Sequence, residues 1–147
     1  MNNTDYNILL VEDEESDATL VKMAFKKNNI LSPVQWVKDG MEAVAYLNAE
    51  GTYADRVHYP FPQVLLVDLK MPRMNGLELL QWLRLNSHFK TIPTIVMTSS
   101  RQEIDIEKAY DLGANTYMIK PSSFDELQNM VKAIHEYWAL SVKPKPR

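Results

Sequence analysis

Residues 64–76 read VLLVDLKMPRMNG and combine three structural signals in one short stretch. The apolar run Val64–Asp68 is rich in branched side chains and ends in a carboxylate, which predicts a buried β-strand. A proline and a glycine follow, and they indicate a turn. Leu77, Leu80 and Leu83 then recur at helical spacing. The stretch therefore predicts one strand that is followed directly by one helix.

The same order of strand and helix recurs along the whole chain. Strands are predicted at Asn7–Val11, Val34–Val37, Val64–Asp68, Thr94–Thr98 and Thr116–Ile119, and helices at Ser16–Asn28, Met41–Ala49, from Gly76, from Ser100 to Leu112 and from Ser123 as far as Val142. Continuously apolar strands that alternate with helices are typical of a parallel sheet covered on both faces. We therefore expect a doubly wound α/β fold with right-handed crossovers.

Two S-x-x-E patterns predict where the last two helices begin. Ser100 with Glu103, and Ser123 with Glu126, have the spacing of a capping box. The connection 50–63 is long and contains two prolines, so we expect no further helix in it.

Composition limits the possible chemistry and location. The chain has 147 residues and no cysteine, which suits one domain and excludes disulfides, thiolate metal sites and a thiol nucleophile. We expect a domain at residues 1–142 and a frayed basic tail at 143–147. The net charge is −3, or −6 without the three basic residues of that tail, so nucleic acid is a poor partner. The sequence shows no membrane span or basic leader, and we expect a cytoplasmic protein.

Polar residues collect at the predicted carboxyl ends of the strands, where open parallel sheets bind ligands. They are Glu12, Asp13, Asp68, Thr98 and Lys120. Three carboxylates repel one another unless a hard cation such as Mg²⁺ joins them. Asp68 could then attack phosphorus, while Lys120 and the Thr98 hydroxyl bind phosphoryl oxygens. Taken singly, these residues would be an acidic turn, a surface lysine and a strand threonine, so the prediction depends on their conjunction.

The same residues form an ordered motif. An acidic pair follows the first strand, D-x-x-M-P-x-M-x-G spans 68–76, Thr98 ends the fourth strand, and Lys120 precedes Pro121. In this order they resemble the receiver domain of two-component response regulators, the chemotaxis-regulator type. The likeness extends over nearly the whole chain. The insertion at 50–63 and the long last helix are most similar to the regulators paired with bacterial phytochromes.

The resemblance implies a fold and a set of roles. The sheet would be flavodoxin-like with strand order 2-1-3-4-5. A sensor histidine kinase or a phosphotransfer protein would phosphorylate Asp68, with Mg²⁺ held by Asp13, Asp68, the Lys70 backbone carbonyl and, through water, Glu12. Lys120 would pair with Asp68, a cis peptide bond would precede Pro121, and Thr98 and Tyr117 would form the switch that changes a protein-interaction face.

The family also commonly pairs through the fourth helix, fifth strand and fifth helix. Because Tyr110, Tyr117, Tyr137 and Trp138 lie in these segments, we predict a symmetric homodimer that phosphorylation strengthens. The alternative is that these aromatic side chains simply cover the core.

Two other functions remain as alternatives. The first is an enzyme, a phosphotransferase or phosphatase with an aspartyl nucleophile. Such enzymes usually carry a second acid two residues further on, where this chain has Lys70. The second is a pseudo-receiver that binds partners without phosphorylation, and the intact set of acidic residues, threonine and lysine argues against it. We therefore expect a phosphoacceptor that assists its own phosphorylation and dephosphorylation and is not an enzyme.

Overall fold

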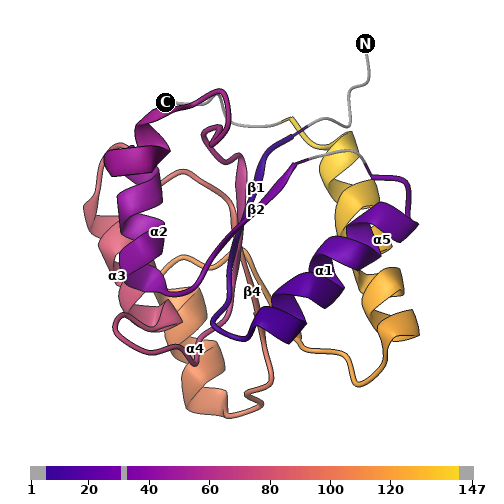
Figure 1. Cartoon of the computed structure of the whole chain (residues 1–147). Helices are drawn as coiled ribbons and strands as arrows, with labels where there is room; N and C mark the ends of the chain where they lie inside the picture. The colour runs from indigo at the N-terminus through magenta and orange to yellow at the C-terminus, as the bar shows by residue number, and fades with distance from the viewer. Residues whose placement is uncertain (1–5, 31–32, 143–147) are drawn as a thin grey trace.

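The computed structural model describes residues 6–30 and 33–142. Its elements are β1 Ile8–Val11, α1 Glu15–Lys27, β2 Val34–Val37, α2 Gly40–Leu47, a 3-10 helix Gly51–Ala54, β3 Val64–Val67, α3 Gly76–Leu85, β4 Thr94–Thr98, α4 Glu103–Asp111, β5 Thr116–Ile119 and α5 Phe124–Leu140. All neighbouring strands are parallel, and their order is β2-β1-β3-β4-β5. The predicted fold and strand order are confirmed, and Figure 1 shows α2, α3 and α4 on one face of the sheet and α1 and α5 on the other. Of the described helices, none combines the length and apolar character that crossing a bilayer would require.

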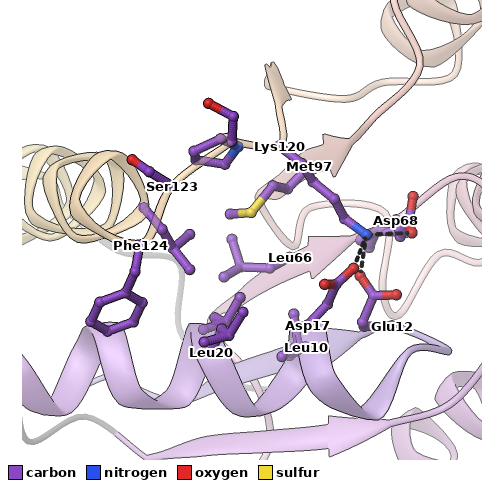
Figure 2. Close-up of a pocket in the computed structure, with 15 residues that line it drawn as sticks. Leu10, Glu12, Asp17, Leu20, Leu66, Asp68, Met97, Lys120, Ser123 and Phe124 are labelled. Atoms are coloured by element: carbon purple, nitrogen blue, oxygen red, sulfur yellow. Dashed lines mark hydrogen bonds and ion pairs between the residues drawn. The ribbon is translucent and has the colours of Figure 1, made fainter.

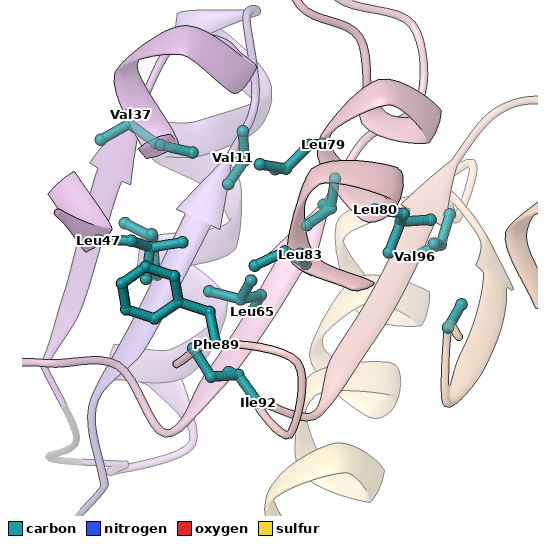
Figure 3. Packing of buried hydrophobic residues seen from close by; sticks show 14 of the residues in the cluster. Val11, Val37, Leu47, Leu65, Leu79, Leu80, Leu83, Phe89, Ile92 and Val96 are labelled. Atoms are coloured by element: carbon teal, nitrogen blue, oxygen red, sulfur yellow. The ribbon is translucent and has the colours of Figure 1, made fainter. Parts of the chain in front are cut away.

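The alternation of side chains along the strands divides the core in two. Leu9, Leu65 and Val96 face α2 and α3, where Leu79, Leu80 and Leu83 of α3 are completely buried (Figure 3). Leu10 and Leu66 point the other way, toward α1 and α5. Because successive residues of a strand point to opposite faces, these fully apolar strands supply both halves of the core.

The turn between β3 and α3 is fixed by two residues. Asn75 caps α3 by accepting a hydrogen bond from the Glu78 backbone N–H, and the Glu78 side chain accepts one from Asn75 in return. Gly76 follows, and a Cβ atom at this position would overlap the Asp68 carbonyl oxygen. A glycine is therefore needed to bring the start of α3 against the end of β3.

The start of α4 differs from the prediction. Gln102, two residues after Ser100, occupies the cap position and makes no side-chain cap hydrogen bond. The Ser100 hydroxyl instead donates to Asp105 at 2.5 Å and accepts a hydrogen bond from the Gln102 backbone N–H at 3.3 Å, ahead of the first turn of α4. The predicted cap of α5 is confirmed, because Ser123 accepts a hydrogen bond from the Glu126 N–H at 3.2 Å.

The connection between α2 and β3 is more ordered than predicted. It begins with the 3-10 helix, and its later part is tied to α2 by side chains. Tyr46 donates from its hydroxyl to the Pro60 carbonyl at 2.7 Å. Arg56 donates to the Leu47 carbonyl at 3.0 Å and lies 5.5 Å from the centre of the Tyr46 ring. These aromatic and cationic contacts hold the connection against α2, although no α-helix forms in it. The predicted tail 143–147 lies outside the described residues.

Candidate functional site

The carboxyl ends of β1 and β3 bring three carboxylates together. Val11 and Val67 are register partners in the sheet, so the residues that follow them are also neighbours. One oxygen from each of Glu12, Asp13 and Asp68 lies within 4.8 Å of the others. Glu12 and Asp68 are buried, and Asp13 is half-buried. The three residues that the sequence predicted to meet do meet at this edge.

The acidic cluster, defined as Glu12, Asp13 and Asp68, fits a hard divalent cation. All of its donors are carboxylate oxygens, which Mg²⁺ prefers, and the close spacing allows several of them to face one ion. Burial raises the pKa of Glu12 to about 7, and the negative charge of Asp68 adds to the rise, although hydrogen bonds from Lys120 and the Glu14 backbone oppose it. The cluster therefore carries the charge repulsion that a bound cation relieves.

The Lys120 side chain reaches this cluster from the end of β5. Its Nζ lies 2.7 Å from Glu12 Oε1, 3.0 Å from Asp68 Oδ2 and 2.8 Å from Asp17 Oδ2 (Figure 2). Burial alone would lower the pKa of the Lys120 ammonium, but hydrogen bonds to the three carboxylates outweigh it and hold this pKa above its usual value. The expected pairing of Lys120 with Asp68 is confirmed.

Asp17 was not among the predicted site residues. It lies in the first turn of α1, where an acidic residue is already explained by the helix dipole. Nothing in the sequence relates it to Lys120, which is 103 positions away. The fold alone brings the two together.

The cis peptide bond expected before Pro121 is wrong, because the described residues contain none. Lys120 makes all three ion pairs with a trans bond, and trans is the intrinsically favoured isomer of an X-Pro bond.

Thr98 and Tyr117 lie on the neighbouring strands β4 and β5. Thr98 is fully buried at the end of β4, and its hydroxyl oxygen accepts a hydrogen bond from the Ser100 N–H at 3.4 Å. The Tyr117 ring is half-buried and its hydroxyl donates to the Ser100 carbonyl at 2.9 Å. Burial raises the pKa of this hydroxyl. Both residues predicted for the switch thus contact the loop between β4 and α4.

Lys70 connects the Asp68 loop to α4. Its backbone N–H donates to Asp68 Oδ1 at 3.3 Å, so its peptide unit lies beside the cluster. Its ammonium is 3.2 Å from Asp105 Oδ2, the same oxygen that accepts from Ser100. The link between Lys70, Asp105 and Ser100 was not predicted, because neither the capping-box pattern at Ser100 nor the motif at 68–76 relates these residues to Asp105.

The aromatic residues of the predicted dimer face divide into two groups. Tyr137 is 74% exposed and Tyr110 is 47% exposed, whereas Trp138 is only 8% exposed. Trp138 packs edge-on against Tyr6, with their ring centroids 6.1 Å apart. Trp138 therefore covers the core, as the alternative interpretation expects, and it continues the apolar stripe of α5.

Comparison with known proteins agrees with this geometry. Residues 8–132 match the model of the response regulator receiver domain family. The chain is 35% identical to Response regulator Rcp1 of Synechocystis, over 92% of this chain and 90% of that protein. It is also 35% identical to the probable methanogenesis regulatory protein FilR2 of Methanothrix harundinacea, over 89% and 82% of the two chains.

Solved structures are similar over nearly their whole length. The phosphorylated cyanobacterial phytochrome response regulator RcpA superposes with a TM-score of 0.87 and 36% identity, covering 96% of this chain and 99% of that one. The Mn²⁺-bound form of Rcp1 gives a TM-score of 0.84 at 34% identity and covers 95% and 99%.

Proposed function

The chain belongs to the family of response regulator receiver domains, and from this premise we propose that it accepts a phosphoryl group on Asp68 from a sensor histidine kinase or a phosphotransfer protein. The observation that carries the assignment is the position of the Asp68 carboxylate. It is buried between the other two acids of the cluster and the Lys120 ammonium, 3.0 Å away. The family role in two-component signalling is phosphorylation by a kinase, and Asp68 directly follows β3, the central strand of the sheet.

In the proposed reaction, an oxygen of Asp68 forms a bond to phosphorus as the bond from phosphorus to the histidine nitrogen of the donor breaks. Lys120 and the Thr98 hydroxyl would hold phosphoryl oxygens. Asp13, Asp68 and the Lys70 carbonyl would bind Mg²⁺ directly, and Glu12 would act through water. The ion would supply positive charge that neutralises the phosphoryl oxygens. The Mn²⁺-bound structure of Rcp1 supports a divalent ion in this family.

Thr98 and Tyr117 are proposed to convert phosphorylation into a change of surface. A hydrogen bond from the Thr98 hydroxyl to the phosphoryl group would draw this hydroxyl away from the Ser100 N–H. The loop at Ser100 would then shift, and the Tyr117 hydroxyl would lose its hydrogen bond to the Ser100 carbonyl. The two packings would differ at the face of α4 and β5. Contacts that exist only in the phosphorylated state would shift the population between them.

Acetyl phosphate with Mg²⁺ tests the acceptor. The wild-type protein should gain one phosphoryl group by intact mass, and Asp68→Asn should gain none. The same substitution at the exposed Asp111, on α4, should leave labelling unchanged. Mapping of the label to Thr98 or Ser99 in the wild-type protein would refute the assignment.

We also propose that the chain is a phosphoacceptor and not a turnover enzyme. Lys70 stands where aspartyl phosphotransferases usually carry a second acid, and its ammonium is engaged by Asp105. Hydrolysis of a small phosphoester far above one equivalent per chain would instead support the enzyme alternative. A pseudo-receiver would fail the acetyl phosphate test altogether.

The partner kinase is proposed to be of the phytochrome type. Support comes from the likeness to Rcp1 and to RcpA, which is described as a phytochrome response regulator. Faster phosphotransfer to this chain from a phytochrome histidine kinase than from an unrelated kinase would agree with this choice. Equal rates would contradict it.

A homodimer through α4, β5 and α5 is the proposed assembly, strengthened by phosphorylation. Tyr137 offers exposed aromatic surface there, whereas Trp138 belongs to the core. In sedimentation of the beryllofluoride-treated protein, Tyr137→Glu should weaken association, and Glu136→Gln, at a neighbouring exposed position, should not. A monomer under all conditions would exclude the dimer.

A further inference from the structure

Asp17 is a fourth acid at the site and does not belong to the acidic cluster. Its Oδ2 lies 2.8 Å from Lys120 Nζ, on the α1 side, and its side chain is 40% exposed. Figure 2 shows the Asp17 carboxylate meeting the ammonium from α1 beside Glu12, while Asp68 meets it from β3. Asp17 thus binds the lysine without being one of the three acids that can face a cation together.

The three carboxylates use the full capacity of the lysine. An ammonium group has three N–H donors, and Lys120 has one carboxylate within 3.0 Å for each of them. Its single positive charge is shared among Asp17, Glu12 and Asp68. Asp17 meets Nζ from α1 and Asp68 meets it from β3, so a shift of the ammonium toward one of these acids lengthens its distance to the other. Asp17 therefore competes directly with Glu12 and Asp68 for the lysine.

The lysine is not fully enclosed, since its side chain is 20% exposed. A cavity of about 130 Å³ adjoins it between α1 and α5 and is lined by Asp17, Lys120, Leu20 and Phe124, among others. Lys120 and Asp17 therefore share the lining of this space (Figure 2).

We infer that Asp17 is a positioning residue, which draws the Lys120 ammonium toward α1 and so leaves Glu12 and Asp68 more available to a divalent cation. The inference deepens the proposed function and rests on it for the identity of the cation. The helix dipole explains an acid in the first turn of α1, but Glu15 serves that role equally. Only Asp17 of these two has an ion pair with Lys120.

Titration of the full chain with Mg²⁺ alone tests this inference, with the shift in melting temperature and calorimetry as readouts. Asp17→Asn should bind Mg²⁺ more weakly by on the order of threefold to tenfold, since the lysine would then pair more strongly with the acidic cluster. Glu15→Gln is the matched control, because it removes the same charge from the same helical turn. Asp13→Ala should abolish most of the Mg²⁺ response and so show that the titration reports the cluster.

Two further variants separate positioning from a general charge effect. In a Lys120→Gln background, Asp17→Asn should change Mg²⁺ affinity no more than Glu15→Gln does, because there is no ammonium left to position. Asp17→Glu keeps the charge and should restore most of the affinity lost in Asp17→Asn. If Lys120→Gln does not fold, Asp17→Glu still decides, since failure to restore binding overturns the inference.

Equal Mg²⁺ affinity in Asp17→Asn and Glu15→Gln would also overturn it. If wild-type Asp68 accepts a phosphoryl group while these two variants bind Mg²⁺ alike, the positioning role fails and the proposed function stands. If Asp68 is not phosphorylated but the two variants differ in Mg²⁺ affinity as expected, the proposed function fails and the positioning role stands.

Discussion

On the face covered by α2, α3 and α4, the α3 side chains Leu79, Leu80 and Leu83 have no exposed surface, whereas the face covered by α1 and α5 borders two hollows. One hollow, of about 130 Å³, lies beside Lys120, and the other, of about 400 Å³, lies between β3, β4, β5 and the end of α5. Because close-packed interiors resist small displacements, the packing on the first face helps to hold β3, the strand that precedes Asp68. Lys120 lies beside one of the hollows that border the second face.

The acids of the α2–α4 face and those of the site also differ in their hydrogen-bond donors and in the direction of their pKa shifts. On the α2–α4 face, burial raises the pKa of Asp39, but hydrogen bonds from Arg73 and the Glu42 N–H outweigh it and hold that pKa below its usual value. The hydrogen bond from Ser100 similarly lowers the pKa of Asp105. Glu12 shares one ammonium with two other acids, and its pKa is raised. Asp39 and Asp105 therefore each have their own donors, whereas the site keeps an excess of carboxylate.

The largest expected difference between the faces is in the stability lost when a leucine is truncated. Leu83→Ala on α3 should lower the free energy of unfolding by about 4 kcal/mol, because closely packed surroundings leave a cavity. Leu127→Ala on α5 should lower it by about 2 kcal/mol, since this side chain already borders the hollow beside Lys120. Urea unfolding of both variants measures the difference. Equal losses would break the contrast between a tight and a loose face.

The sequence predicted the strands, the meeting of the acidic cluster and the order of the sheet because these depend on local patterns and an ordered motif. VLLVD at 64–68 is typical of a buried strand ending in an acid, and the strand itself ends at Val67, one residue earlier. It did not predict that Ser100 would bond to Asp105, because the S-x-x-E pattern does not contain the competing acceptor.

Asp17 and Trp138 show two further limits. The pairing of Asp17 with Lys120 depends on how α1 sits on the sheet, which no local pattern encodes. The burial of Trp138 could be predicted from the sequence, because this residue continues the helical spacing of Leu127, Val131 and Ile134 along α5. Its aromatic character suggested an interface, but the helical period was the better guide.

A second prediction concerns pH and sharpens the contrast in charge. A carboxyl whose pKa rises from 4.5 unfolded to about 7 folded binds its proton more tightly in the folded state, so its contribution to stability is lost as pH rises through this window. Without divalent cations, Glu12→Gln should match the wild type at pH 5 and be about 2 kcal/mol more stable at pH 8. Urea unfolding across this range measures it.

Asp39 and Asp105 should not contribute to the change in the free energy of unfolding between pH 5 and pH 8. Their pKa values are below the ordinary range, so the stability they add is lost only as pH falls toward acid. If the free energies of unfolding of Glu12→Gln and of the wild type changed in parallel from pH 5 to pH 8, Glu12 would not be an acid with a raised pKa.

The smallest expected effect is the difference in stability between cap substitutions in α3 and α1, two helices on opposite faces of the sheet. Asn75 accepts from the Glu78 N–H at 2.9 Å in the capping box of α3, whereas Glu14, at the cap position of α1, makes no side-chain cap hydrogen bond. Asn75→Ala should therefore lower the free energy of unfolding by about 1 kcal/mol, because a backbone N–H loses its partner. Glu14→Ala should change it by less than about 0.5 kcal/mol, the usual range for a surface position. Thermal unfolding in metal-free buffer compares the two. If Glu14→Ala lowered the free energy of unfolding as much as Asn75→Ala, the first turn of α1 would be held as firmly as that of α3. Because Asp17 lies in that turn, the looser packing would then not extend to the site.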